Sequence, residues 1–183
     1  YSMESVWIPW FTKKMEINDK LTINKYVKYY IQIGLITVIL VLLIAPELIE
    51  IMSPKEYWSG KKLVPPILLS TFIIFMYSIS VDLEYYYKST TIIAIYTVIA
   101  AVLNLLLNYI LIPTYGSIGA AYSTAISYFV IFLLNCHSAR KIDKDLFPLK
   151  IYIKPFIVIV LFIVFSYIST NIPILRWGMI IVI

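Results

Sequence analysis

The sequence predicts an all-α membrane protein, a polytopic bundle of transmembrane helices. Hydrophobic residues make up 61% of the 183 positions and charged residues only 14%, whereas a water-soluble domain has about 45–50% and about 25%. Five apolar stretches have lengths near the roughly 20 residues with which a helix crosses a bilayer. They are continuously apolar, which favours helices over the alternating strands of a membrane barrel. A soluble enzyme and a disordered chain are excluded, and the single cysteine, Cys136, excludes an intramolecular disulfide and a cysteine-rich zinc cluster.

The predicted spans follow one another with short connections, as one membrane region over residues 1–183. We expect them at residues 29–52, 64–86, 92–112, 117–136 and 155–170. Pro54 follows the first, Pro65 and Pro66 fit the first turn of the second, and the short Pro113–Gly116 link makes the third and fourth an antiparallel hairpin. A further apolar segment starts near Trp177 and stops with the chain. With the apolar start at Tyr1, this predicts a C-terminal fragment of a longer polytopic protein.

Basic residues predict the orientation, because cytoplasmic loops keep the excess of Lys and Arg. The segments 13–28, 87–91 and 138–154 share one side by alternation and hold eleven of the fifteen basic residues. The other side holds the remaining four: Lys55, Lys61, Lys62 and Arg176. The three lysine-bearing segments are therefore predicted to be cytoplasmic in a multi-pass protein, and no separate basic face remains for nucleic acid.

Charged residues near the span ends are candidates for a substrate path or gate, because ionisable groups at membrane depth are costly. Asp82, Glu84 and Lys88 cluster at the inner end of the second span. Glu84 and Lys88 have the i, i+4 spacing of an ion pair, so a solvated helix end is the alternative. Asp82 lies deepest of the three, and Glu47 follows Pro46 at the outer end of the first span.

Polar and small residues mark the predicted hairpin. Asn104 and Asn108 share one face of the third span, and their amides need hydrogen-bond partners inside the membrane. Other helices, water in a cavity or a substrate could provide these partners. After the turn at Gly116, small residues repeat every four positions at Gly119, Ser123 and Ser127. This spacing predicts close packing of the fourth span on the third.

Signs of catalysis are few. The sequence contains no nucleophile elbow, zinc-protease motif, phosphate loop or dinucleotide fingerprint. Cys136 and His137 are adjacent, which points them about 100° apart on a helix and leaves a zinc site without its other ligands. We therefore expect no catalytic, cofactor-binding or metal-binding residue.

One stretch resembles a known family. Residues Leu103–Ala121 combine an N-x-x-x-N helix, an L-I-P-x-x-G turn and a G-A-A helix start. The segments around Ile44–Ile49, Pro65–Pro66 and Trp7–Pro9 show similar agreement in the same order. Together they resemble the polysaccharide transporter family, the Wzx-type flippases of the multidrug, oligosaccharidyl-lipid and polysaccharide exporter superfamily.

The resemblance implies a fold and an activity. The chain would be the C-terminal lobe of a two-lobed bundle that flips an undecaprenyl-diphosphate-linked oligosaccharide across the bacterial cytoplasmic membrane by alternating access. Capsule, O-antigen or exopolysaccharide assembly would be the process, and the polysaccharide polymerase and chain-length machinery the partners. No Lys or Arg lies inside a predicted span, so diphosphate-binding residues are expected in the other lobe.

Three alternatives remain open. The nearest is another transporter of the superfamily, an ion-coupled drug antiporter or a peptidoglycan-precursor flippase. A membrane enzyme acting on polyprenyl-linked sugars would need a loop with catalytic carboxylates, and residues 138–154 offer only Asp143 and Asp145. A purely structural subunit is the third.

Overall fold

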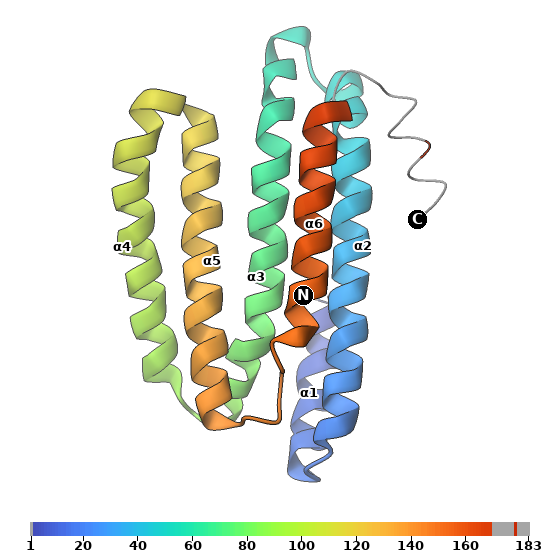
Figure 1. Cartoon of the computed structure of the whole chain (residues 1–183), viewed down its shortest axis with the longest axis vertical. Coiled ribbons are helices and arrows are strands. Elements are labelled where there is room, and N and C mark those ends of the chain that lie inside the picture. Colours follow the sequence, from blue (N-terminus) through green and yellow to red (C-terminus); the bar gives the residue numbers. More distant parts are fainter. Residues whose placement is uncertain (1, 170–177, 179–183) are drawn as a thin grey trace.

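The computed structural model describes residues 2–169 and 178, which fold into helices with no strand among them (Figure 1). In chain order the elements are α1 (Ser2–Glu16), α2 (Lys20–Met52), the 3-10 helix η1 (Lys55–Leu63), α3 (Val64–Tyr86), α4 (Thr90–Tyr115), α5 (Ser117–Ile142) and α6 (Lys150–Ser169). Five of these segments are long and apolar enough to cross a membrane. The prediction of an all-α bundle with five helices of membrane-spanning length and composition is confirmed. The segment predicted from Trp177 lies outside the described residues.

The helices run past the predicted spans at their lysine-rich ends. α2 begins at Lys20 because the Asp19 carboxylate caps it, accepting a hydrogen bond of 3.2 Å from the Thr22 backbone N–H. Asn18, with φ 54°, turns the chain between α1 and α2. α5 continues to Ile142, and α6 starts at Lys150. Charged side chains at such ends reach beyond the hydrocarbon, so these extensions fit the expected interface.

The α4–α5 hairpin turns more sharply than predicted. The expected turn at Pro113–Gly116 is wrong in extent, because α4 continues through Pro113 to Tyr115 and α5 starts at Ser117. Proline in the last turn removes only one backbone hydrogen bond of the helix. The reversal is made by Gly116 alone, at φ 59° and ψ −137°, a conformation that strains a residue with a Cβ.

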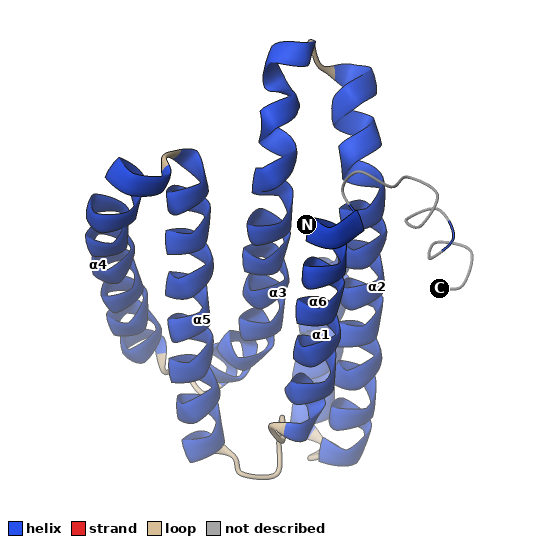
Figure 2. Ribbon diagram, turned by 45° about the horizontal axis from the view of Figure 1, so that its top comes forward, coloured by secondary structure: helices blue, strands red, loops and turns tan. Residues whose placement is uncertain are grey.

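α3 occupies the centre of the bundle, with α2 and α6 on one side and α5 on the other (Figures 1 and 2). Its buried residues Phe72, Met76 and Ile79 join one hydrophobic core with Ile31 of α2 and Ile159 of α6. α4 lies at the edge and packs mainly on α5. Ala100 is the one buried residue among those described in α4. The rest of this helix is therefore available for contact with lipid or with another polypeptide segment.

The three predicted cytoplasmic connections lie together at one end of the bundle, where α1, α3 and α5 end and α2, α4 and α6 begin (Figure 1). We call this the lysine-rich end. Here α2 holds the loop between α5 and α6. Lys20 Nζ lies 2.7 Å from Asp143, and Asn24 accepts a bond of 2.9 Å from the Phe147 N–H and donates one of 2.7 Å to the Asp145 carbonyl oxygen. This loop is thereby fixed against the start of α2.

Candidate functional site: a polar cleft among α3, α4 and α5

A cleft of about 370 Å³ opens among α3, α4 and α5, within the membrane-spanning part of the bundle. Its lining carries hydroxyl, amide and phenol groups and no charged side chain. The polar residues are Tyr77 of α3, Thr97 and Asn104 of α4, and Thr124, Ser127 and Tyr128 of α5. The threonine and serine hydroxyls donate to carbonyls four residues earlier on their own helices, over 2.8–3.0 Å. Their oxygens retain lone pairs that can accept from a ligand.

Tyr77 and Tyr128 form an aromatic wall of the cleft. Their rings lie 6.2 Å apart between centroids at an interplanar angle of 20°. Such amphipathic rings offer an apolar face together with a hydroxyl group. The cleft can therefore make both stacking contacts and hydrogen bonds with a neutral, hydroxyl-rich ligand.

Asn104 and Asn108 bond to each other within α4, and not to a neighbouring helix as the sequence suggested. The Asn108 amide donates 2.9 Å to the Asn104 side-chain oxygen, since i, i+4 spacing brings the two amides together. Asn104 lines the cleft, and its oxygen is engaged, so its amide N–H bonds are the ones to meet a ligand. The Asn108 oxygen is buried and has no hydrogen-bond partner among the described residues. An orphan acceptor costs about 1–3 kcal/mol, which a donor placed nearby would recover.

The small residues of α5 set the width of the hairpin. A Cβ built on Gly119 would lie 2.4 Å from the Leu111 carbonyl oxygen and 2.7 Å from its carbon, so the backbones of α4 and α5 meet there. Ser123 and Ser127, one and two turns further along α5, are buried, and Ser127 reaches the cleft. Gly116 contributes through its turn conformation, because nothing lies within 4 Å of a Cβ added there.

Asp82 and Glu84 have different surroundings although only one residue separates them. Asp82 is partly exposed and accepts a hydrogen bond of 2.8 Å from the indole Nε1–H of Trp7 on α1. Glu84 is completely buried, and the Ser138 hydroxyl of α5 faces it. No full hydrogen bond to either Glu84 carboxyl oxygen is formed within the described residues. Glu84 is thus the more buried of the two within the protein, while Asp82 lies further from the end of α3.

The ion pair that the spacing of Glu84 and Lys88 permits does not form. α3 ends at Tyr86, and Lys88 has φ 57°, so the two residues do not share a helix. The Ser89 N–H instead bonds over 2.8 Å to the Glu84 backbone carbonyl. The alternative of a solvated helix end is wrong for Glu84, because this residue is completely buried, whereas Lys88 is exposed.

Glu47 lies in the last turns of α2, whereas Asp82 and Glu84 lie in the last turns of α3, at the opposite end of the bundle. It is partly buried, whereas Glu50, one turn later, pairs with Lys61 of η1. The structure brings neither residue to the cleft. Among the predicted candidates, Asn104 and Ser127 line it directly.

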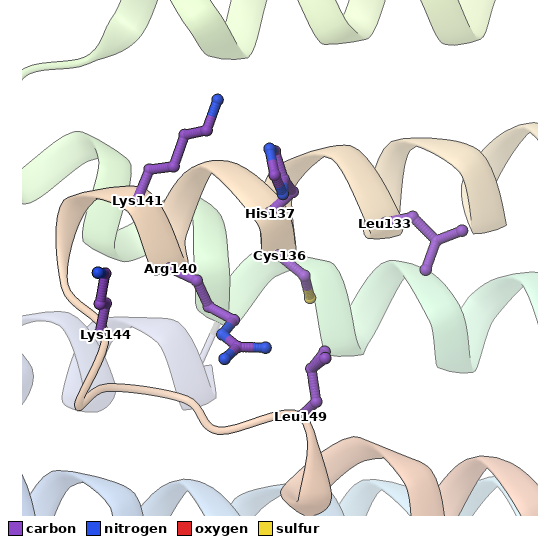
Figure 3. Close-up of a pocket in the computed structure, with 7 residues that line it drawn as sticks. All are labelled: Leu133, Cys136, His137, Arg140, Lys141, Lys144 and Leu149. Atoms are coloured by element: carbon purple, nitrogen blue, oxygen red, sulfur yellow. The ribbon is translucent and has the colours of Figure 1, made fainter.

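A second pocket, of about 360 Å³, lies at the lysine-rich end of α5 (Figure 3). Arg140 and Cys136 point toward Leu149 at the start of α6, while His137 and Lys141 point to the opposite side of the helix (Figure 3). Cys136 is buried, with its sulfur 3.6 Å from the Ser80 hydroxyl. Within residues 2–169 and 178, no three His, Cys, Asp or Glu side chains are grouped so that they could hold a metal ion.

Sequence reasoning missed three residues of the cleft and the contact of Trp7 with Asp82. Tyr77, Thr97 and Tyr128 look like ordinary membrane residues in the sequence. Only the packing of three helices brings them to one cleft, and no spacing rule encodes it. Trp7 and Asp82 lie 75 residues apart.

The chain matches no family model, no curated protein and no solved structure.

Proposed function

We propose that this chain forms part of a membrane transporter that flips a lipid-linked oligosaccharide, an undecaprenyl-diphosphate-linked repeat unit, across the bacterial cytoplasmic membrane for polysaccharide assembly. The observation that carries the proposal is the uncharged polar cleft inside a bundle of apolar helices. Polar side chains inside a membrane are costly and mark substrate pathways. The Wzx-like pattern of residues Leu103–Ala121 supports the same activity, and Asn104 belongs to both the pattern and the cleft.

The chemistry of the cleft suits sugars better than ions. A glycan presents many hydroxyl groups, each of which donates and accepts hydrogen bonds, and apolar ring faces that pack on aromatic rings. Asn104, Thr97 and Thr124 supply the polar contacts, and Tyr77 with Tyr128 the aromatic ones. Because no cation lines the cleft, the diphosphate of the substrate is assigned to residues elsewhere.

The topology fits a rocking transporter. α4 packs mainly on α5, so the wall of the cleft that it forms can shift without disturbing the core around α3. Transporters of this kind bind substrate near the bilayer midplane and alternate access by movement of helix groups. The lysine-rich end is placed in the cytoplasm, with residues 13–28, 87–91 and 138–154 on that side.

The test is deletion of the full-length gene in its host, followed by measurement of lipid-linked repeat units on each face of the membrane. The proposal expects them to accumulate on the cytoplasmic face and the wild-type gene to cure this. Asn104→Ala should complement poorly. Leu105→Ala, at the next position of α4 with a side chain that is 69% exposed, is the matched control and should complement fully.

Two results would overturn the proposal. The first is normal surface polysaccharide, without accumulated intermediate, in a strain that has no second flippase. The transporter would then carry another substrate, such as a drug cation or a peptidoglycan precursor. The second is equal complementation by Asn104→Ala and Leu105→Ala at matched protein levels, which would mean that the substrate does not pass through the cleft.

A further inference from the structure

A groove of about 300 Å³ runs between α2 and α6 at the lysine-rich end, apart from the cleft and from the pocket on α5. The two helices lie side by side and both start at this end (Figure 1). The mouth of the groove is polar, lined by Lys28 and Gln32 of α2 and Lys150 and Lys154 of α6. Its floor is apolar, lined by Leu35, Ile151, Pro155 and Val158.

The three lysines of this groove carry uncompensated charge. All three are exposed, and no carboxylate of the described residues lies within ion-pair distance of them. Three aspartates at this end pair with other lysines, since Lys14 binds Asp19 and Lys20 binds the aspartates of the loop after α5. The groove therefore has a positive mouth that no carboxylate in the described part of the chain neutralises.

The depth of the groove matches one end of a phospholipid. From Lys28 to Leu35 along α2, and from Lys150 to Val158 along α6, the helical rise amounts to roughly 10–12 Å. Lys28 and Lys150 thus lie about two turns from Leu35 and Val158, and Lys154 lies about one turn from Val158. A phosphate at the level of the lysines would place the first part of an acyl chain against Leu35 and Val158.

We propose that this α2–α6 groove binds an anionic phospholipid, with its phosphate among Lys28, Lys150 and Lys154 and an acyl chain along the floor. Basic pockets between transmembrane helices on the cytoplasmic side recognise such head groups, and anionic lipids are enriched in that leaflet. The pocket on α5 is a weaker site for one phosphate, since its Arg140 and Lys141 point to opposite sides of the helix (Figure 3). The bound lipid stabilises the pairing of α2 with α6.

The experiment uses the purified full-length protein in detergent and counts bound lipid by native mass spectrometry. The probes are dioleoyl phosphatidylglycerol, which is anionic, and dioleoyl phosphatidylcholine, which has the same chains and no net charge. The variant is K28Q/K150Q/K154Q. The matched control is K13Q/K25Q/K88Q, which removes the same charge from exposed lysines at the same end, outside the groove and outside the pocket on α5.

The proposal expects phosphatidylglycerol to bind the wild type and the control alike, and the groove variant tenfold or more weakly, because each lysine near an anionic lipid contributes about fivefold. V158W, which fills the floor and keeps every charge, should also weaken binding. Equal loss in the groove and control variants would overturn the proposal, as would equal binding of phosphatidylcholine. Displacement of the lipid by equimolar inorganic phosphate would also overturn it, because the acyl chain would then contribute nothing.

Discussion

Replacing Gly119 by alanine tests whether the α4–α5 hairpin depends on direct contact of the two backbones. The added Cβ would lie 2.4 Å from the Leu111 carbonyl oxygen, whereas ordinary van der Waals contact begins at 3.4 Å. The helices must therefore separate by about 1 Å, because the atoms that clash belong to the backbone and have no rotamer to change.

The expected cost follows from two opposing effects. Overpacking of a tight contact costs about 1–3 kcal/mol, and alanine in a helix recovers up to about 1 kcal/mol relative to glycine. The net loss is on the order of 1–2 kcal/mol, which lowers the midpoint of thermal unfolding by roughly 2–4 °C per kcal/mol in a chain of this size. Gly119→Val should cost more than Gly119→Ala.

The assay is thermal unfolding of the detergent-solubilised protein, followed by circular dichroism. Gly60→Ala is the matched control, because nothing lies within 4 Å of a Cβ added at Gly60. It should leave the midpoint unchanged or raise it. An unchanged midpoint in Gly119→Ala, equal to that of Gly60→Ala, would refute the close contact of α4 and α5 at this point.

Three further predictions concern the lysine-rich end. Asn24→Leu removes two hydrogen bonds to the loop after α5. The free energy of unfolding should fall by about 1–3 kcal/mol, and limited proteolysis should cut this loop faster. Unchanged cleavage would contradict the conclusion that α2 holds the loop in place. Trp7→Phe keeps the aromatic contact but removes the donor to Asp82, so unfolding should cost about 1 kcal/mol less, and in the Asp82→Ala background the same change should cost nothing. The hydrogen bond from Lys14 lowers the pKa of Asp19 below its ordinary value of 3.8. The stabilisation that this hydrogen bond gives is fully present above pH 3.8. It is lost as the pH falls through the lower pKa that Asp19 has in the folded state. In Asp19→Asn, the midpoint of thermal unfolding should therefore fall less steeply than in the wild type as the pH is lowered below 3.8.

The sequence predicted the spans well because lipid imposes a strong and simple rule. A long apolar run between charged or proline-containing connections has few alternatives to a transmembrane helix. The ends were harder to place, as α2 shows. Its first turn from Lys20 is set by the Asp19 cap and by its contacts with the loop after α5, and a hydropathy window does not detect either.

The candidate site was only partly predictable. The spacing of Asn104 and Asn108 put both amides on one face of α4, and Gly119 marked the close contact of α5 with α4. The environment of Glu84 was not predictable, because burial depends on how α5 packs over the end of α3. Its neighbour Asp82 has a partner on α1 that no local pattern indicates.

The single-residue turn at Gly116 also bears on how the protein enters the membrane. α4 ends at Tyr115 and α5 begins at Ser117, so almost no polar backbone has to be carried across the bilayer between these two helices. Two apolar helices joined in this way are favoured to insert together, as one hairpin, because α4 alone would leave Asn104 and Asn108 with fewer neighbours in the lipid. A charged or lengthened turn at this point would act first on insertion during synthesis, before any effect on the finished bundle.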